Sequence, residues 1–233
     1  MEQQTSPSTP RKAATLLVVR DDPFEVLMMR RSSGATFPSV LVFPGGVVEA
    51  SDSADEWMPR LLGADDLDPE ERGYRVAALR ETWEEAGLLL AHEGPAGDDF
   101  AEATLDLSRL HHFAHWLTPT HLPKRFDTRF YLTTATRDQV ASFDGNETVS
   151  VEWIAPQDAL DRAERGDRML VPTRLNLLRL AESATSAEAI TAAAGRPFFS
   201  VMPEFLGAVE GGRRLGIPAE AGYGVTEAIQ PVY

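Results

Sequence analysis

Three glutamates stand close together in a segment that we expect to be helical. They are Glu81, Glu84 and Glu85, within the run RETWEEAGL at residues 80–88. At about 100° of helical rotation per residue, their side chains fall within an arc of roughly 100°. Clustered carboxylate oxygens, in a chain without cysteine, favour magnesium, manganese or calcium over zinc or copper. The spacing therefore indicates a site for a hard divalent cation.

The same run has a second interpretation as a solvated acidic face, because charged side chains on helices commonly point into water. Like charges three and four residues apart destabilise a helix by about 0.2–0.5 kcal/mol per pair, and a bound cation would offset that repulsion. From these residues alone, the metal site and the solvated face remain open alternatives. The opposite side of the predicted helix is apolar and would face the core: Val76, Leu79, Trp83 and Ala86.

A glycine-rich turn precedes this helix in the sequence. The apolar run Val40–Phe43 is expected to be a buried strand, and Pro44-Gly45-Gly46 follows it directly. A glycine-rich turn lets the backbone approach a ligand closely. We therefore expect the turn to lie beside the acidic face of the helix.

This combination resembles the Nudix hydrolases, whose signature opens with a glycine and closes with Arg-Glu-aliphatic-x-Glu-Glu-x-Gly-aliphatic. Asp52 stands where the family has its first glutamate, and Thr82 stands where an aliphatic residue is usual. An insertion at about residues 53–72 interrupts the signature, and over residues 13–180 the chain resembles the subgroup typified by peroxisomal coenzyme A diphosphatases. The matching positions are Gly46, Arg80, Glu81, Glu84, Glu85, Gly87 and Leu88.

The resemblance implies Mg²⁺- or Mn²⁺-dependent hydrolysis of a diphosphate bond in a small nucleoside diphosphate derivative. Coenzyme A or an acyl-coenzyme A, ADP-ribose and NADH are the substrates considered. The metal would be held by Glu81, Glu84, Glu85 and the carbonyl of Gly46. A catalytically silent nucleotide-binding module, acting as a sensor or scaffold, is the alternative function.

The resemblance also implies the remaining catalytic roles. A water molecule would attack one phosphorus, and Glu147 in the turn after Asp144 would accept its proton. Glu85 would take that role if Glu147 were misplaced, and Glu152 competes for the position of a distal glutamate. Arg80 would pair with Glu81 and orient it.

Arginines and histidines supply the other candidate ligands. Guanidinium groups donate two hydrogen bonds to phosphate oxygens, which makes arginine the best candidate to bind the substrate. His111 and His115 would be one helical turn apart and could bind zinc, but no third ligand is evident, so surface or strand-edge positions are the favoured interpretation. The candidate substrate-binding residues are Arg30, Arg31, Arg125 and Arg129.

Composition restricts the class of protein. The chain has 233 residues, of which 43% are hydrophobic, enough for a substantial core. Its net charge of −14 argues against a nucleic-acid partner, which would require a basic surface. No apolar run approaches the roughly 20 residues of a membrane span, and the polar N-terminus lacks the apolar centre of a secretory signal. We therefore expect a cytoplasmic protein with no nucleic-acid or membrane partner.

The order of elements predicts an α/β (α+β) fold in which a mixed β-sheet lies between helices, an α-β-α sandwich. Residues 1–12 would be a disordered tail, residues 13–184 the Nudix domain, and residues 185–233 a helical and irregular C-terminal extension. That extension would pack on the domain or on a second subunit of a homodimer. Expected strands are 13–19, 25–29, 40–43, 88–91, 113–117, 128–134 and 148–154, and expected helices are 69–86, 101–110, 156–165, 172–184 and 187–194.

Overall fold

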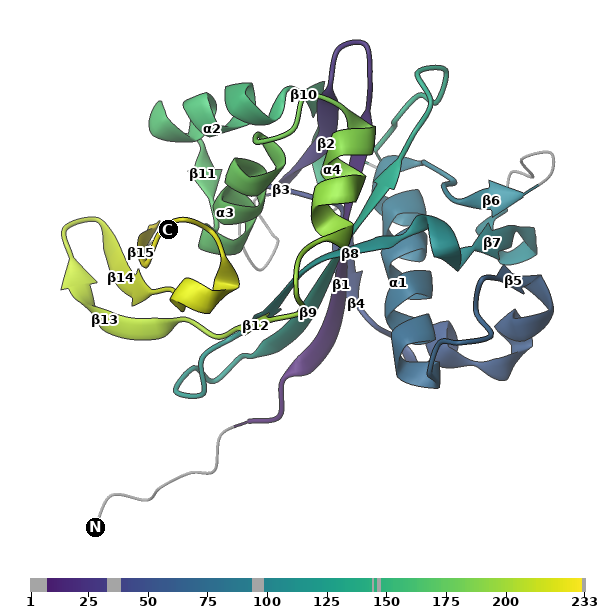
Figure 1. Cartoon of the computed structure of the whole chain (residues 1–233), viewed down its shortest axis with the longest axis horizontal. Helices are drawn as coiled ribbons and strands as arrows, with labels where there is room; N and C mark the ends of the chain where they lie inside the picture. Colours follow the sequence, from purple (N-terminus) through teal and green to yellow (C-terminus); the bar gives the residue numbers. More distant parts are fainter. Residues whose placement is uncertain (1–7, 33–38, 94–98, 144, 146–147, 232–233) are drawn as a thin grey trace.

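A nine-stranded mixed sheet forms the centre of the molecule (Figure 1). The computed structural model describes residues 8–32, 39–93, 99–143, 145 and 148–231. The strands follow the order β11-β3-β2-β1-β9-β8-β12, with β10 paired to β2 and β4 paired to β1. Their bounds are β1 Arg11–Arg20, β2 Glu25–Arg31, β3 Val40–Val42, β4 Gly45–Val47, β8 His111–Leu117, β9 Phe126–Thr134, β10 Thr148–Ile154, β11 Arg168–Met169 and β12 Ser200–Val201.

Both strand directions occur within this sheet. β1 runs parallel to β9 and antiparallel to β2, and β8 runs antiparallel to β9. The predicted mixed sheet is therefore confirmed. One detail differs from the expected turn after Phe43, because Gly45–Val47 pairs with β1 as a short strand of its own.

Helices cover both faces of the sheet, as Figure 1 shows. Successive side chains of β1 alternate between two cores, since Leu17 and Val19 belong to one cluster and Leu16 and Val18 to the other. The first cluster includes residues of α2, α3 and α4, and the second includes residues of α1. The expected α-β-α sandwich is therefore confirmed. The helices are α1 Pro69–Ala86, α2 Pro156–Glu164, α3 Val171–Leu180 and α4 Ser186–Ala194.

Helix α1 begins and ends at the residues that the sequence predicted. The side chain of Asp68 accepts a hydrogen bond of 2.8 Å from the backbone N–H of Glu71, and Pro69 occupies the first turn. Gly87 ends the helix in a left-handed conformation with φ 65°. These local signals place the acidic run on the last turns of α1.

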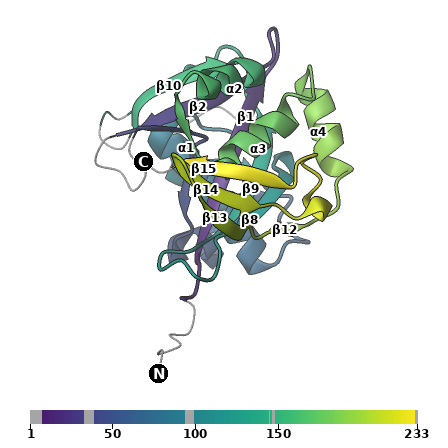
Figure 2. The same cartoon turned by 90° about the vertical axis from the view of Figure 1, so that its left-hand side faces the viewer.

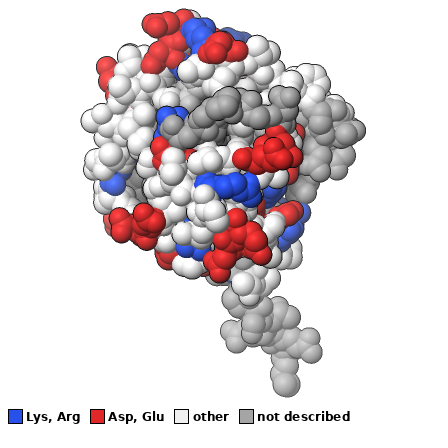
Figure 3. Space-filling model, turned by 90° about the vertical axis from the view of Figure 1, so that its right-hand side faces the viewer, with Lys and Arg blue, Asp and Glu red and all other residues white. Residues whose placement is uncertain are grey.

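The segment between β4 and α1, which includes the insertion, forms a small subdomain beside α1. It contains the 3₁₀ helices η1 Ala50–Ser53 and η2 Asp55–Arg60, and its strand β5 Leu61–Leu62 joins β7 Thr104–Asp106 and β6 His92–Glu93 in a second sheet. Acidic and basic side chains are scattered over this side of the molecule (Figure 3).

Two predicted elements next to this subdomain are wrong. Residues 88–91 form no strand, and residues 101–110 form no α-helix. The latter segment instead comprises η3 Phe100–Glu102, β7 and η4 Leu107–Arg109. Its fully buried Leu105 pairs with Leu61 of the insertion, a contact that local sequence patterns do not reveal.

The C-terminal extension contains a three-stranded antiparallel sheet that the sequence analysis did not predict. Its strands are β13 Glu204–Val209, β14 Gly212–Gly216 and β15 Glu227–Pro231, and η5 Ala219–Ala221 lies between the last two. This sheet lies in front of the central sheet in Figure 2. The hydroxyl of Tyr223 accepts a hydrogen bond from Trp116 Nε1 (3.0 Å) and donates one to Asn176 (2.6 Å), so the extension packs on the domain.

Candidate active site

A cavity of about 800 Å³ lies between the end of the central sheet and the C-terminal sheet. This volume falls within the range typical of small-ligand sites. Residues of the central strands, β4 and α1 form one part of the wall. The β8–β9 connection, the start of α3 and the C-terminal sheet form another part. Two of the three predicted acidic ligands, Glu81 and Glu85, line it together with Gly45 and Gly46.

Glu81 lies directly against the backbone of Gly46. A Cβ atom at Gly46 would come within 2.4 Å of both carboxylate oxygens of Glu81, so any residue larger than glycine would displace that carboxylate. Burial raises the pKa of Glu81, and the charge of Arg80 and its hydrogen bond counteract this only in part. A carboxylate removed from water in this way is suited to binding a cation.

Glu85 is 7% exposed and is held by the glycine turn. The backbone N–H of Gly45 donates a hydrogen bond of 2.9 Å to its Oε2. Arg31 Nη1 lies 3.8 Å from its Oε1. The turn therefore orients this second carboxylate towards the cavity, as the sequence predicted for a glycine bend beside the acidic helix.

Arg80 connects the acidic run to the insertion. Its Nε and Nη2 donate to the two carboxylate oxygens of Asp52 at 2.8 and 3.0 Å, and Asp52 is 2% exposed. Its Nη1 donates to Glu81 (3.0 Å) and to Glu84 (2.9 Å). The expected Arg80–Glu81 pair is therefore present in the structure, and Asp52 is the residue that holds the guanidinium in place.

Glu84 is not brought together with the other two glutamates. Its side chain is 47% exposed, lies outside the cavity lining and accepts the hydrogen bond from Arg80. Within the described ranges, no group of three acidic or histidine side chains is arranged to hold a metal ion. The oxygen donors of Glu81 and Glu85 fit a hard cation, whereas Glu84 lies outside the cavity with its Oε2 bonded to Arg80.

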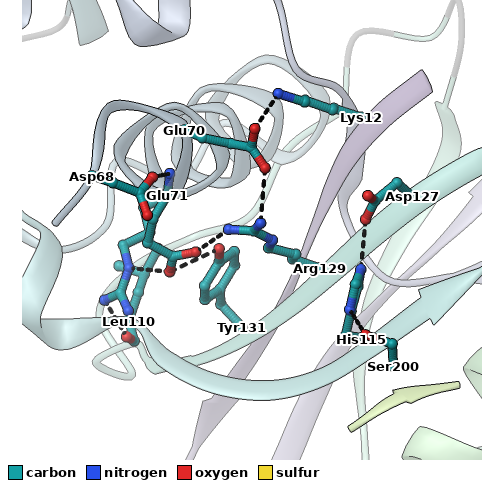
Figure 4. A network of polar contacts seen from close by, with 11 residues as sticks. Lys12, Asp68, Glu70, Glu71, Leu110, His115, Asp127, Arg129, Tyr131 and Ser200 are labelled. Carbon is teal, nitrogen blue, oxygen red and sulfur yellow. Dashed lines mark hydrogen bonds and ion pairs between the residues drawn. The ribbon is translucent and has the colours of Figure 1, made fainter. Parts of the chain in front are cut away.

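Only one of the four predicted substrate arginines lines the cavity, and that residue is Arg31. Arg30 donates to Asp167 (2.8 Å), and Arg125 donates to the carbonyls of Thr118 and Ser8. Arg129 lies between Glu70 and Glu71 of α1, as Figure 4 shows.

Three cavity-lining cations were absent from the sequence-based candidates: Arg11, Lys124 and Arg213. They lie on β1, on the β8–β9 connection and on β14, which are far apart in the chain. Arg11 falls in the segment expected to be a tail, and Arg213 falls in the segment expected to be irregular. The sequence analysis did not identify β14 as a strand that packs on the domain, so it did not place Arg213 in the cavity.

The remaining predicted site residues are the two candidate distal glutamates and two histidines. Glu147 lies outside the described residues, and Glu152 pairs with Arg162 at 2.7 Å, away from the cavity. His111 and His115 both belong to strand β8, so helical spacing does not apply to them. His115 instead contacts Asp127 of β9 (2.5 Å) and Ser200 of β12 (2.6 Å), so it connects three neighbouring strands of the central sheet (Figure 4).

Comparison with known proteins adds independent information. The family model described as NUDIX domain matches residues 9–173. The chain is 28% identical to putative nudix hydrolase 7 of Caenorhabditis elegans, over 74% of this chain and 61% of that protein. It is 29% and 26% identical to acyl-coenzyme A diphosphatase NUDT19 of Gallus gallus and Homo sapiens, over 70% and 80% of this chain and 65% and 66% of those proteins. The chain thus spans just under two thirds of the length of these relatives.

A solved structure agrees with the fold. The crystal structure of a NUDIX hydrolase from Alicyclobacillus acidocaldarius superimposes with a TM-score of 0.70 and 30% identity, covering 79% of this chain and 96% of that one. In the part of the chain that the structure describes, no helix combines the length and the apolar character needed to cross a membrane. Residues 174–233 lie beyond the region matched by the family model.

Proposed function

The chain belongs to the NUDIX family, and from this premise we propose that it hydrolyses a diphosphate bond in a nucleoside diphosphate derivative. The observation that carries the proposal is the pair Glu81 and Glu85, held beside Gly45 and Gly46 in the wall of a cavity of about 800 Å³. Buried carboxylates beside a close backbone approach are suited to binding a cation, and a bound cation would attract the oxygens of a diphosphate.

Nudix hydrolases generally use divalent metal ions, and we propose Mg²⁺ or Mn²⁺ for this chain. When bound, the ion supplies positive charge against the diphosphate oxygens and makes a water molecule more acidic. Glu81, Glu85 and the carbonyl of Gly46 would hold it, and Glu84 would join them by exchanging its hydrogen bond to Arg80. Arg80 would keep Glu81 in position through the 3.0 Å hydrogen bond.

The other residues of the cavity would bind the substrate and move the proton. Arg31 would donate hydrogen bonds to a phosphate oxygen beside Glu85. Glu85 would also accept a proton from the attacking water, with its carboxylate held in position by the Gly45 N–H. Glu147 stays a second candidate for this base.

Two curated relatives are named acyl-coenzyme A diphosphatase, which makes coenzyme A and its acyl esters the first substrates to test. Apolar residues of the cavity wall would suit the uncharged part of such a molecule: Trp116, Leu122, Phe126, Pro203, Phe205 and Leu215. ADP-ribose and NADH contain the same type of bond and complete the panel.

Turnover of this panel should require Mg²⁺ or Mn²⁺ and stop in excess chelator. Glu81→Gln and Glu85→Gln should fold normally and each lower kcat by a factor of about 100 or more, because each removes a negative charge beside the reacting diphosphate. Glu102→Gln is the matched control, since Glu102 is exposed and lies outside the cavity. Turnover that is indifferent to chelator, or parental kcat in both cavity variants, would contradict the proposal.

The alternative is a nucleotide-binding module without turnover. The observation in its favour is Glu84, which is bonded to Arg80 and separate from the cavity. Calorimetry on the same panel distinguishes the two functions. Measurable affinity for a nucleotide without any product, in the presence of either metal, would support the silent module.

A further inference from the structure

Three cationic side chains line a part of the cavity that the proposed chemistry does not use. They are Arg11, Lys124 and Arg213. Arg11 and Arg213 are exposed, and no acidic side chain within the described residues pairs with either. The neighbouring Arg214 differs, because it lies 3.9 Å from Glu227 and outside the cavity. Within the described residues, the charges of Arg11 and Arg213 are therefore available to an anionic ligand.

Arg11 and Lys124 are held close together by the backbone. The N–H of Arg11 donates a hydrogen bond of 2.9 Å to the carbonyl of Arg125, the residue after Lys124. Phe126 is the register partner of Arg11 in the β1–β9 pair, and the ammonium group of Lys124 lies 5.6 Å from the centre of its ring. Two cations therefore share one corner of the cavity.

This corner is separate from the carboxylates. Arg11 and Thr15 line the cavity from the same strand, and Thr15 pairs with Gly45, which binds Glu85. Four residues of extended strand place the backbones of Arg11 and Thr15 about 13 Å apart. A group bound at the corner is therefore different from the group held beside Glu85.

The C-terminal sheet supplies the third cation. Arg213 and Leu215 are two residues apart on β14 and both line the cavity, whereas Arg214 between them does not. Phe205 pairs with Leu215, and its ring lies 6.0 Å from that of His121 on the β8–β9 connection. One face of this sheet is thus part of the cavity wall, although it lies outside the matched residues 9–173.

We propose that Arg213, with Arg11 and Lys124, binds a phosphomonoester group that the substrate carries in addition to its diphosphate. This inference rests on the proposed function and extends it to the substrate class. A phosphomonoester carries close to two negative charges and three acceptor oxygens, which matches several cations lining one cavity better than a hydroxyl or an amide does. Arg213 is then a specificity-determining residue contributed by the C-terminal extension.

Substrate pairs that differ by one phosphate test the proposal. Suitable pairs are NADPH and NADH, 2′-phospho-ADP-ribose and ADP-ribose, and coenzyme A and 3′-dephospho-coenzyme A. The parental protein should have the higher kcat/KM for the phosphorylated member of at least one pair. Arg213→Gln should lower kcat/KM for that member by roughly tenfold to a hundredfold, through KM, and leave its partner unchanged.

Arg214→Gln is the matched control, because it removes the same charge from the adjacent position outside the cavity. Its kcat/KM values should equal the parental ones for both members. If the parental protein is active but shows no preference in any pair, or if Arg213→Gln affects both members equally, the phosphomonoester site is refuted while diphosphate hydrolysis stands.

If no member of any substrate pair is hydrolysed, a binding measurement still tests the phosphomonoester site separately from diphosphate hydrolysis. Calorimetry would compare adenosine 2′,5′-bisphosphate and adenosine 3′,5′-bisphosphate with adenosine 5′-monophosphate. At least one bisphosphate should bind more tightly than the monophosphate to the parental protein, and Arg213→Gln should abolish the difference. Equal affinities in the parental protein would refute the site, independently of any turnover.

Discussion

At the scale of single residues, the position of Asp52 accounts for the geometry around Arg80. Its short carboxylate is buried, accepts two hydrogen bonds from the guanidinium and accepts a third from the backbone N–H of Glu49 at 2.8 Å. The sequence indicated Asp52 only as a departure from the family pattern. The structure shows that η1 brings this side chain within hydrogen-bond distance of Arg80.

His112 gives a prediction about pH and stability. Burial lowers its pKa from 6.5 to about 4, the charge of Glu71 opposes the shift only in part, and its buried Nε2 has no hydrogen-bond partner within the described residues. Between these two pH values the unfolded chain binds a proton at this residue and the folded chain does not. The free energy of unfolding therefore has its full value above pH 6.5. It falls by on the order of 2–3 kcal/mol as the pH decreases towards 4.

Urea unfolding at pH 7 and pH 4.5 measures this effect. His112→Phe should lose less stability than the parental protein between the two values, because it has no imidazole to protonate. His121→Phe is the control, since it removes an exposed imidazole in place of the buried one. Parallel losses in the parental protein and in His112→Phe would show that His112 does not contribute.

At the scale of elements, two glycines that end helices allow the effect of an added Cβ atom to be compared at positive and at negative φ. Gly87 ends α1 at φ 65°, and a Cβ atom there would lie 2.4 Å from Ser142 Oγ. Gly195 ends α4 at φ −80°, with no neighbouring atom closer than 3.6 Å to such a Cβ atom. Gly87→Ala should cost roughly 1–2 kcal/mol or more in the free energy of unfolding, and Gly195→Ala should be neutral or slightly stabilising. Chemical denaturation of both variants checks the contrast, and equal effects would contradict it.

Elements with strong local signals were predictable, and elements that depend on distant contacts were not. Helix α1 follows from Asp68, Pro69 and Gly87, which are adjacent to its ends. The strand β7 was mistaken for a helix because its partner β5 lies in the insertion. Local patterns also do not show which face of a strand meets the cavity, so they could not separate Arg31, which lines it, from Arg129, which binds α1.

At the scale of the whole molecule, buried polar contacts join the C-terminal extension to the domain. Tyr223 lies between Trp116 and Asn176, and the guanidinium of Arg179 lies 3.7 Å from the centre of its ring. Asn176 is fully buried, so losing the hydrogen bond to it would leave a carbonyl oxygen without a partner. The extension and the domain should therefore unfold together.

Tyr223→Phe tests this coupling. It should lower the free energy of unfolding by about 1–3 kcal/mol, since the hydroxyl contacts on both sides are removed together. Unfolding followed by tryptophan fluorescence and by circular dichroism should remain a single coincident transition at a lower urea concentration. A separate early transition, with the main midpoint unchanged, would show instead that the extension unfolds independently.

Two distant stretches of the chain form the cavity wall. This arrangement affects how related proteins can come to accept different ligands. The acidic pair belongs to α1, whereas Phe205, Arg213 and Leu215 belong to strands near the C-terminus. Substitutions in those late strands alter the shape and charge offered to the distal part of a ligand without disturbing the turn at Gly45 and Gly46. Variation confined to those late strands would therefore change which molecule fits the cavity, while the acidic pair on α1 is inherited unchanged.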